Sequence, residues 1–501
     1  MKRLFVIFAG ILLLCAGFAK AQNGSDEYLK AVQLYADTMI EYGRDRYGPV
    51  HSPLFAATLD SEKLELFPQR PPSIKGVREE DRSTAGANPL HDENLYQVLY
   101  ALSEITGNQK YAKAADDALA WFFHNSQSPT TGLLAWGEHL SWLFRQERPH
   151  PSDRHEFSRR WVLWDINFRL APEASLRFAL GLWEHQVADQ RDANFSRHAR
   201  YSSHGPEINA DFSGSAGHYV DAWAAAYQHS KDPQFSKAIQ VFVDAFDSRR
   251  NLITGTIPAF RWRPERTWPG SNLSFAIDLW ASAARLPSDL VIDPWNKQQP
   301  KEITERMRML SRRIDDAYLA TKHELHDGGR GFLHAAWSHN LEPDGSGVES
   351  EEQSPFTNNW DTGYDRATHA SAAMLCLLRY SQTRDDRYKK LVVATAQRYL
   401  TIDPPASTIL FPGAIADVIA LLVNSARITG DQRYAERANH FGRLALDKFF
   451  SGSKLPRATS EHRHYEAITR GDSLAMELID LWAYRNNRRL RRELLWTDAN
   501  P

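Results

Sequence analysis

Two histidines and one glutamate in residues 136–201 carry the side chains needed to hold a divalent metal ion. His139 follows the sequence Trp-Gly-Glu, Glu156 follows Arg-His, and His198 comes directly after Arg197. Two neutral imidazoles and one carboxylate would leave open positions on an octahedral ion, which a substrate carboxylate could fill. No short metal motif such as HExxH joins these positions. Each residue alone is more often structural, so the predicted site depends on all three together.

The elements expected around these residues are helices and loops. His139 is expected in a loop after a helix over residues 112–123. Glu156 precedes an aromatic run with helical spacing, so we expect it at the start of a helix. His198 is expected to follow a helix from Ala174 to Val187. The candidate ligands would then lie in loops that flank helices.

The rest of the chain has the pattern of paired helices joined by similar corners. At each corner a glycine or polar residue ends one helix, Asp or Asn caps the next, and an aromatic residue packs the following turn. The corners are at residues 106–111, 231–235, 383–388 and 429–434, and weaker helices are expected at 274–284 and 303–321. Strands are expected only at Leu252–Phe260 and Ser407–Phe411.

These patterns predict an all-α fold of one domain over residues 22–501. Irregular spacing of the corners argues against a uniform solenoid, and six to seven helical hairpins with minor strands fit the length as an α/α toroid. The active site would lie in a cleft at one end, built by loops. Cys376 lies in an apolar run and is expected to be a buried core thiol.

The first 21 residues have the pattern of a cleaved signal peptide. Lys2 and Arg3 precede an apolar run, and Ala19-Lys20-Ala21 is a small-x-small cleavage site. Cys15 follows Leu14, where a lipoprotein signal requires a small residue, so ordinary cleavage is favoured. We expect a periplasmic or secreted protein without a membrane span after the leader, because no later run approaches about 18 apolar residues.

The charge balance argues against nucleic acid as a partner. The chain has 60 lysines and arginines against 62 aspartates and glutamates. An acidic ligand would therefore have to be held by a local cluster of cations. The 15 tryptophans and 18 tyrosines offer flat faces that suit sugar rings, although most of them are expected in the core.

The order of His139, Glu156 and the adjacent pair Arg197-His198 resembles the periplasmic pectate lyases of polysaccharide lyase family two. Three further stretches resemble wider bacterial relatives of these enzymes. They are residues 45–55 (DRYGPVHSPLF), 132–139 (GLLAWGEH) and 464–472 (HYEAITRGD). The resemblance runs from about Tyr42 to Trp482. It implies an α/α barrel that cleaves polygalacturonate or a related polyuronate by β-elimination to 4,5-unsaturated products.

The resemblance also implies a role for each residue of the candidate site. A divalent ion, most often manganese, would be held by His139, Glu156 and His198, and calcium or another transition ion would also be compatible. Arg197 would remove the C5 proton of the uronate. Because guanidinium normally stays protonated, this needs a desolvated site beside a metal ion. Otherwise Arg197 would only clamp the substrate carboxylate.

Six other residues are candidates for substrate binding in the same cleft. They are Arg159, Arg160, His91, His464, Tyr465 and Arg470. Each alone is more often structural. The segment after Glu156 departs from the relatives, which carry a lysine and small aromatics there, so the preferred uronate stays open. His155 is a rival ligand to Glu156 or its neighbour.

Three other functions fit parts of the sequence. A glycoside hydrolase acting on uronides needs two carboxyl groups and no metal. Candidate residues for such a pair are Asp165, Asp221, Asp361 and Asp365. A sugar epimerase on the same toroid is suggested by Arg154-His155-Glu156, although export weighs against it. A non-catalytic sugar-binding protein would show affinity without turnover.

Overall fold

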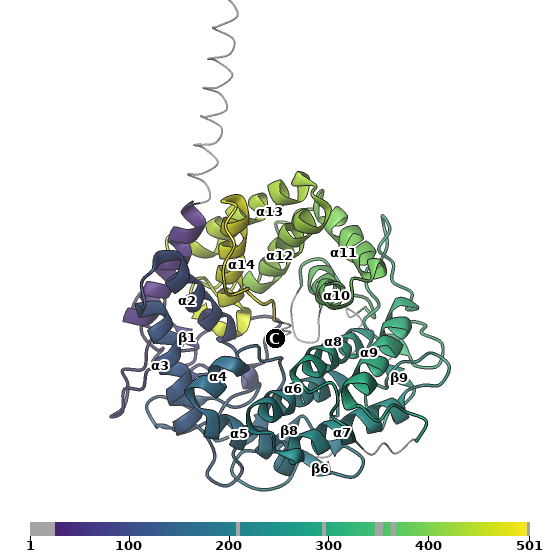
Figure 1. Cartoon of the computed structure of the whole chain (residues 1–501). Helices are drawn as coiled ribbons and strands as arrows, with labels where there is room; N and C mark the ends of the chain where they lie inside the picture. The colour runs from purple at the N-terminus through teal and green to yellow at the C-terminus, as the bar shows by residue number, and fades with distance from the viewer. Residues whose placement is uncertain (1–25, 207–210, 293–296, 346–353, 362–366, 498–501) are drawn as a thin grey trace, which may run out of the picture.

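The helices of the chain form two concentric rings (Figure 1). The computed structural model describes residues 26–206, 211–292, 297–345, 354–361 and 367–497. The inner ring contains α2 (Glu93–Thr106), α4 (Trp164–Leu170), α6 (Ser213–Ser230), α8 (Pro269–Arg285), α10 (His369–Thr383), α12 (Pro412–Thr429) and α14 (Gly471–Arg485). The outer ring contains α3 (Lys110–Asn125), α5 (Pro172–Gly181), α7 (Pro233–Arg249), α9 (Ile303–Leu319), α11 (Asp386–Tyr399), α13 (Gln432–Ala445) and a helix over residues 26–41.

Contacts between neighbouring inner helices run from α6 round to α2, and α4 joins the ring through its contacts with α6 and the outer helix α3. Helix α6 packs on α8, α8 on α10, α10 on α12, α12 on α14, and α14 on α2. The predicted α/α toroid is therefore confirmed. The expected signal peptide, residues 1–21, lies outside the described residues.

The corners between paired helices have the predicted capping residues. Asp232, Asp385 and Asp431 each accept a hydrogen bond from the backbone N–H two residues later, at 2.9, 2.9 and 3.0 Å. Gly107 and Gly430 follow the last residues of α2 and α12 with left-handed φ values of 72° and 76°. These caps satisfy polar backbone groups at the helix ends. The corners predicted from the sequence therefore lie where the structure has them.

The strands are short antiparallel pairs at the ends of the helices. They are β1 (Thr58–Leu59) with β11 (Tyr465–Glu466), β2 (Gly86–Ala87) with β3 (Trp142–Leu143) and β4 (Arg148–Pro149), β5 (Arg154–Glu156) with β8 (His198–Arg200), β6 (Val187–Asp189) with β7 (Asn194–Phe195), and β9 (Arg266–Thr267) with β10 (Ala336–Trp337). Short 3-10 helices cover Glu79–Asp81 and Ala467–Thr469.

Both strands expected from the sequence are wrong. Residues 252–260 form a turn at Gly255, which has φ 80°, and Leu252 in that turn is 91% exposed. Residues 407–411 lead without strand pairing into α12, which begins at Pro412. Apolar, β-branched residues in both stretches produced a strand pattern that no partner strand supports.

The helix expected from Ala174 to Val187 is shorter than predicted. Helix α5 ends at Gly181, and residues Leu182–Gln186 form a π-helical turn before β6 begins at Val187. Such π turns are often found at functional sites. A second π turn covers Leu446–Phe450 after α13.

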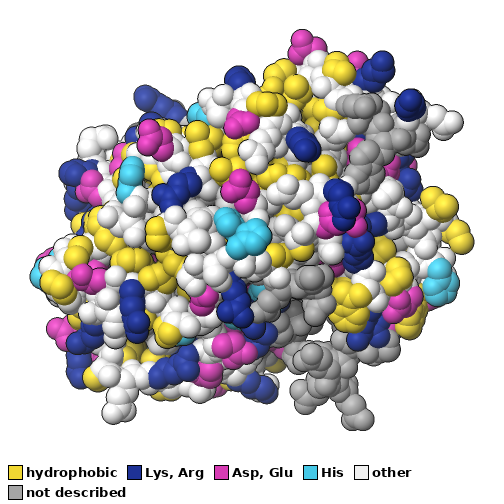
Figure 2. Space-filling view, turned by 90° about the horizontal axis from the view of Figure 1, so that it is seen from below, with side chains coloured by type: hydrophobic (Ala, Val, Ile, Leu, Met, Phe, Trp, Pro, Cys, Tyr) yellow, Lys and Arg dark blue, Asp and Glu magenta, His cyan; other side chains and the backbone are white. Residues whose placement is uncertain are grey.

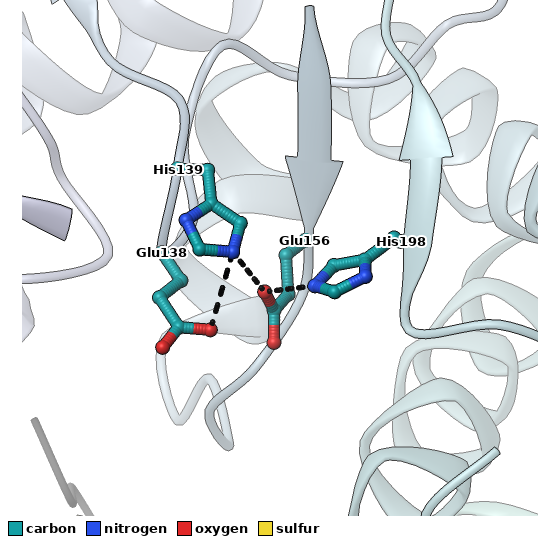
Figure 3. Close-up of side chains that lie close together, drawn as sticks. All are labelled: Glu138, His139, Glu156 and His198. Atoms are coloured by element: carbon teal, nitrogen blue, oxygen red, sulfur yellow. Dashed lines mark hydrogen bonds and ion pairs between the residues drawn. The ribbon is translucent and has the colours of Figure 1, made fainter. Parts of the chain in front are cut away.

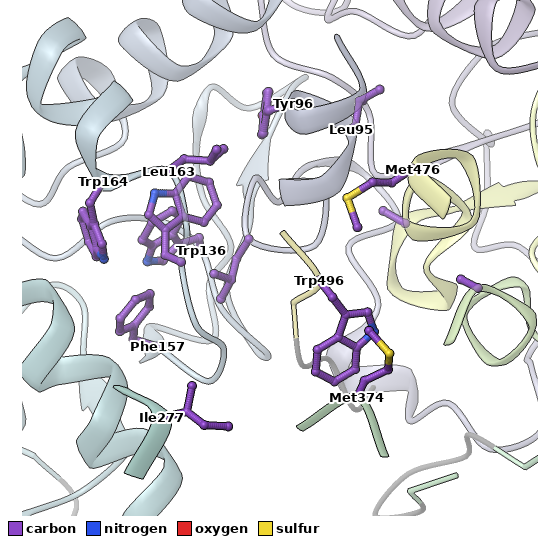
Figure 4. Packing of buried hydrophobic residues seen from close by; sticks show 14 of the residues in the cluster. Leu95, Tyr96, Trp136, Phe157, Leu163, Trp164, Ile277, Met374, Met476 and Trp496 are labelled. Atoms are coloured by element: carbon purple, nitrogen blue, oxygen red, sulfur yellow. The ribbon is translucent and has the colours of Figure 1, made fainter. Parts of the chain in front are cut away.

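Buried hydrophobic side chains from separate elements pack together in the core, among them Trp136, Phe157, Met374 and Trp496 (Figure 4). Trp496 near the C-terminus is buried, and its indole Nε1 donates to Asp417 Oδ1 at 2.8 Å. Cys376 is a buried free thiol, and burial raises its pKa to about 12, so the predicted core role is confirmed. Helix α12 is long and apolar enough to cross a membrane, but 78% of that segment is buried in the fold, as in a core helix.

Candidate metal centre

Strands β5 and β8 place Glu156 and His198 side by side (Figure 3). The strands pair antiparallel with Glu156 opposite His198. Side chains of directly opposite residues lie on the same face of a sheet. Glu156 is thus the last residue of a strand and does not begin a helix, which corrects the expectation from the aromatic spacing. The two ligands come from segments that are far apart in sequence but adjacent in space.

A glycine allows the His139 segment to touch β5. Gly137 has φ 121°, and a Cβ atom there would lie 2.1 Å from the carbonyl oxygen of Glu156. Only glycine tolerates this φ and this close approach. His139 then turns its Nδ1 toward Asp81 Oδ1 at 2.9 Å. Because a carboxylate on one imidazole nitrogen orients the other, Asp81 directs Nε2 of His139 toward Glu156.

Four side chains converge on one point (Figure 3). Glu156 Oε2 is 3.1 Å from His198 Nε2 and 3.7 Å from His139 Nε2, while Glu138 Oε2 is 3.8 Å from His139 Nε2. All four ligand atoms lie within 4.8 Å of one another. Opposite ligands of an ion bound at about 2.1 Å are about 4.2 Å apart, so small side-chain shifts would let one ion reach all four.

Glu138 was not among the metal-binding residues predicted from the sequence. A glutamate next to a histidine gives no signal in the sequence; the structure shows that Gly137, with φ 121°, lets both side chains turn toward one centre. Arg78 forms an ion pair with Glu138 from the opposite side. The structure thus adds a second carboxylate to the predicted set.

The chemistry of these side chains fits a divalent cation. Oε2 of Glu138 is buried, and its nearest cationic group is the Arg197 NH1 at 3.4 Å, too far for a strong hydrogen bond. Burial raises the pKa of Glu156 well above its usual value, and the nearby Glu138 adds to this, while Arg197 opposes it. A bound cation would satisfy the buried oxygens and stabilise both carboxylates. Imidazole nitrogens and carboxylate oxygens together suit a divalent transition ion.

The electrostatics keep His198 neutral, as a metal ligand must be. Burial, followed by the charges of Arg197 and His139, lowers the pKa of His198 to about 3. Burial also tends to raise the pKa of Glu138, but its hydrogen bond with Glu156 and the Arg197 and Arg78 charges bring that pKa down to about 2. At neutral pH the pair therefore offers a neutral imidazole and a carboxylate.

Arg197 is held beside the ligands by Glu156. The guanidinium NH1 is 2.7 Å from Glu156 Oε1 and 3.4 Å from Glu138 Oε2. Glu156 thus uses one oxygen for Arg197 and the other for the two imidazoles. The Arg197 guanidinium also lies over the Phe212 ring, with its Cζ atom 4.8 Å from the centroid.

His155 supports the site from the core and does not join the four ligands. Its side chain is fully buried, and its Nδ1 is 3.0 Å from Oε1 of Gln186. The amide of Gln186 also donates to the backbone carbonyl of Arg197. Gln186 ends the π turn after α5, so this turn ties β5 to β8. Burial lowers the pKa of His155 to about 3.

A cavity of about 1220 Å³ opens next to the centre. Glu138 and Arg197 line it, as do residues in the first turns of α6, α8 and α10. Its described lining includes five cations, Lys75, Arg159, Arg197, Arg263 and Arg266, against three carboxylates, Glu138, Asp344 and Asp361. This local excess and the positive ends of the inner helices favour an acidic ligand.

Of the six candidate binding residues, the structure places two in the cavity wall. His91 lines it, and burial with the Arg159 charge lowers its pKa well below the usual value. Arg159 also lines the cavity, and its pKa is lowered to about 10 by burial, with the Arg470 charge adding to this. Their positions are compatible with contact to a ligand.

The other four lie behind the wall, where they bind to neighbouring side chains. Arg160 Nε donates to Asp278 Oδ1 at 2.6 Å, and His464 Nε2 is 2.9 Å from Glu466 Oε2. The Tyr465 hydroxyl donates to Asp92 Oδ1 at 3.0 Å. Arg470 forms two hydrogen bonds with Asp417, at 2.9 and 2.7 Å. The structure thus places these four residues outside the described lining of the cavity, paired with neighbouring side chains.

Sequence reasoning also missed His218 in the cavity wall. Its Nδ1 is 3.0 Å from Asp278 Oδ2, and Asp278 in turn binds Arg160. His218 lies within α6, where no local motif marks it. Of the aspartates considered for a hydrolase, Asp165 and Asp221 pair with Arg285, Asp361 lines the cavity, and Asp365 lies outside the described residues.

Comparison with known proteins identifies the family that this centre resembles. Residues 52–244 match the family model of periplasmic pectate lyases. The matched stretch includes Arg197 and all four side chains of the candidate metal centre. A pectate disaccharide-lyase of Dickeya dadantii (strain 3937) is 24% identical over 181 residues. That alignment covers 35% of this chain and 32% of the relative, so the chain spans about a third of the relative's length.

Solved structures with a similar course of the chain are distant in sequence. Cellobiose 2-epimerase from Bacillus thermoamylovorans B4167 is 10% identical, with a TM-score of 0.46, and the match covers 91% of this chain and 98% of that one. An unsaturated glucuronyl hydrolase from Streptococcus agalactiae is also 10% identical, with a TM-score of 0.44 and 94% of each chain covered.

Proposed function

We propose that this protein is a metal-dependent lyase that cleaves polygalacturonate or a related polyuronate by β-elimination. The observation that carries the proposal is the convergence of His139, Glu156 and His198 beside Arg197, within the stretch that matches the periplasmic pectate lyases. The cationic lining of the adjacent cavity supports an acidic polysaccharide as substrate. The family description supports a periplasmic or secreted location.

His139, Glu156 and His198, with Glu138, would hold the ion, and manganese fits their donor atoms. When bound, the ion would supply positive charge that neutralises the uronate carboxylate and makes the C5 proton more acidic. Glu156 would keep Arg197 next to that carboxylate through Oε1. To act as the base, Arg197 would have to be in its neutral guanidine form, which a cation bound beside it would favour. Neutral Arg197 would take the C5 proton and become a guanidinium, the C5–H electrons would form the C4=C5 double bond, and the C4–O4 bond would break. O4 would leave with a proton from water in the cavity.

The products of the reaction test this assignment. Purified protein is incubated with polygalacturonate and manganese, and the products are followed by ultraviolet absorbance and mass spectrometry. A lyase gives oligosaccharides with a conjugated double bond and a mass lower by one water than the hydrolysis products. New reducing ends without the absorbing product would instead show a hydrolase. An altered sugar at an uncut chain end would show an epimerase.

A further inference from the structure

Four aromatic side chains form a continuous surface inside the cavity, next to the candidate metal centre. We call Phe212, Phe260, Trp262 and Trp268 the aromatic platform, and all four line the cavity. Phe212 is the ring beneath the Arg197 guanidinium. The platform therefore begins at Phe212, directly beneath Arg197, the residue that is proposed to act on the substrate.

The rings of the platform contact one another from Phe212 to Trp262. Phe212 and Trp268 are stacked, with centroids 5.0 Å apart and an interplanar angle of 22°. Phe260 is 4.8 Å from Phe212 and 4.9 Å from Trp268, and Trp262 is 5.1 Å from Phe260. Trp262 is 52% exposed, whereas Trp136 is fully buried. Core packing does not account for an indole so exposed beside a cavity.

A cation lies at the far end of the platform. The Cζ atom of Arg263 is 4.5 Å from the centroid of the Trp262 ring. Within the described part of the chain, no carboxylate forms an ion pair with Arg263. The neighbouring Arg266, in contrast, has its Nε 3.1 Å from Asp344 Oδ2. Arg263 is therefore the cation of this wall that is placed to receive an acidic group of a ligand.

This combination of groups matches the chemistry of a uronate residue. A sugar ring has apolar C–H faces that pack on aromatic rings, and a uronate adds a carboxylate that a guanidinium binds with two hydrogen bonds. The cavity of about 1220 Å³ also exceeds the roughly 300–1,000 Å³ of sites for single small ligands. There is space for sugar residues at the platform as well as at the metal centre.

We infer that the aromatic platform and Arg263 form a second binding site, for a uronate residue of the chain whose neighbouring part lies at the metal centre. The inference rests on the proposed function, because it assigns the same acidic polysaccharide to both sites. Arg197 and Phe212 would mark the boundary between them. Binding at the platform would hold a long substrate while Arg197 acts on it.

The test is binding of tetragalacturonate to the full chain, freed of metal by a chelator so that no turnover occurs. Isothermal titration calorimetry gives the affinity. Trp262→Ala and Arg263→Gln are each expected to weaken binding by about tenfold, and Trp262→Phe should restore most of the loss, because the aromatic face remains. Leu252→Ala is the matched control, since Leu252 is 91% exposed in the same connection between α7 and α8 and does not line the cavity. Maltotetraose, a neutral tetrasaccharide, should bind at least about tenfold more weakly than tetragalacturonate.

Unchanged tetragalacturonate binding by both Trp262→Ala and Arg263→Gln would overturn the inference. Equal affinity for maltotetraose would overturn the assignment to a uronate. If the wild type makes unsaturated products and the variants bind tetragalacturonate normally, the second binding site is contradicted and the proposed function stands. In the opposite case, the wild-type protein makes no unsaturated product, but Trp262→Ala and Arg263→Gln still bind tetragalacturonate more weakly. That result would contradict the proposed function and support the second binding site. Circular dichroism of each variant checks that it is folded.

Discussion

Glu156 connects the proposed metal site to the proposed base through its two carboxylate oxygens. Oε2 faces the imidazoles of His139 and His198, and Oε1 binds Arg197. A shift of this one side chain would therefore disturb metal binding and the position of Arg197 together. A variant of Glu156 would therefore affect metal binding and proton removal together, whereas a variant of Arg197 tests proton removal separately.

Arg197→Lys is expected to keep the metal and lose turnover. Lysine preserves the positive charge near Glu156 but lacks the planar guanidinium, so its amine would be misplaced for proton transfer from C5. We expect manganese affinity to stay near the wild-type value and kcat to fall by about 10²–10⁴. Calorimetry gives the metal affinity, and the absorbance of the unsaturated product gives kcat. Arg200→Lys is the matched control, because Arg200 lies three residues after Arg197, at the end of β8, and is exposed to solvent.

A higher KM with an unchanged kcat in Arg197→Lys would show that this residue only clamps the substrate carboxylate. That result would leave the metal site intact and remove the proposed role of Arg197 as base.

The sequence predicted three of the four converging side chains, because their order and residue types resembled a known pattern. Glu138 was missed, since a glutamate next to a histidine carries no signal until the backbone shows both turning to one point. Arg160, Tyr465 and Arg470 were assigned to the cleft on residue type alone. Their partners, among them Asp278, come from distant segments that no local pattern reveals.

At the scale of elements, the centre depends on the contact between the His139 segment and strand β5. The strand pair β5–β8 fixes Glu156 opposite His198, and Gln186 of the π turn holds the pair from behind. Helix periodicity in the sequence hid this arrangement, because strands of three residues are too short to show an alternating pattern. The long helices, in contrast, were predicted well from their caps and apolar spacing.

Gly137→Ala is expected to disrupt the centre without altering any ligand. The added Cβ would overlap the carbonyl oxygen of Glu156, and φ 121° is unfavourable for alanine. Backbone strain and overpacking of about 1–3 kcal/mol each should lower Tm, and β5 should shift away from His139. Thermal unfolding and manganese titration measure both effects. Gly270→Ala is the control, because nothing lies within 4 Å of its added Cβ; wild-type Tm and affinity in Gly137→Ala would contradict this account.

Helix α2 carries a buried carboxyl group whose protonation should affect stability. Glu93 accepts a hydrogen bond from the backbone of Val162, yet burial raises its pKa from 4.5 to about 8. Between these values the folded chain keeps a proton that the unfolded chain has released. The Glu93 contribution to stability is therefore present below about pH 4.5 and is lost as pH rises toward 8.

Glu93→Gln should remove this loss, because glutamine stays neutral at all these pH values. Its stability relative to the wild type is expected to rise between pH 5 and 8, by at most about 1.4 kcal/mol per pH unit. Denaturant unfolding at several pH values measures the difference. Glu173→Gln, at an exposed position of α5, should follow the wild type. If the free energy of unfolding changes with pH in the same way for Glu93→Gln and the wild type, Glu93 is not held protonated in the folded chain.

At the scale of the whole molecule, the toroid brings the first turns of several inner helices to one cavity and places the metal centre in its wall. The outer surface is different in character. On the face shown in Figure 2, described cationic and acidic side chains are interspersed and form no continuous basic surface. This agrees with the near-balanced charge of 60 against 62. An acidic polymer of the kind proposed would find no continuous basic surface on this face.

The closed ring was predictable because each helical pair marks its own corner with a cap and an aromatic residue. The contact between α14 and α2, which closes the ring, was not predictable in the same way, since it joins the two ends of the chain. The burial of Trp496 against Asp417 at the centre is another contact of this kind. Local sequence determines where the helices begin and end, whereas the packing of the helices determines which loops meet at the cavity.

The most direct test of the account is the dependence of lyase activity on metal. Protein is stripped with a chelator, shown by elemental analysis to be free of metal, and assayed on polygalacturonate while manganese is added back. We expect the unsaturated product to disappear on stripping and to return fully at about one manganese ion per chain. His198→Ala should need at least about tenfold more manganese, because it lacks one ligand. Full activity of the metal-free protein would contradict the account.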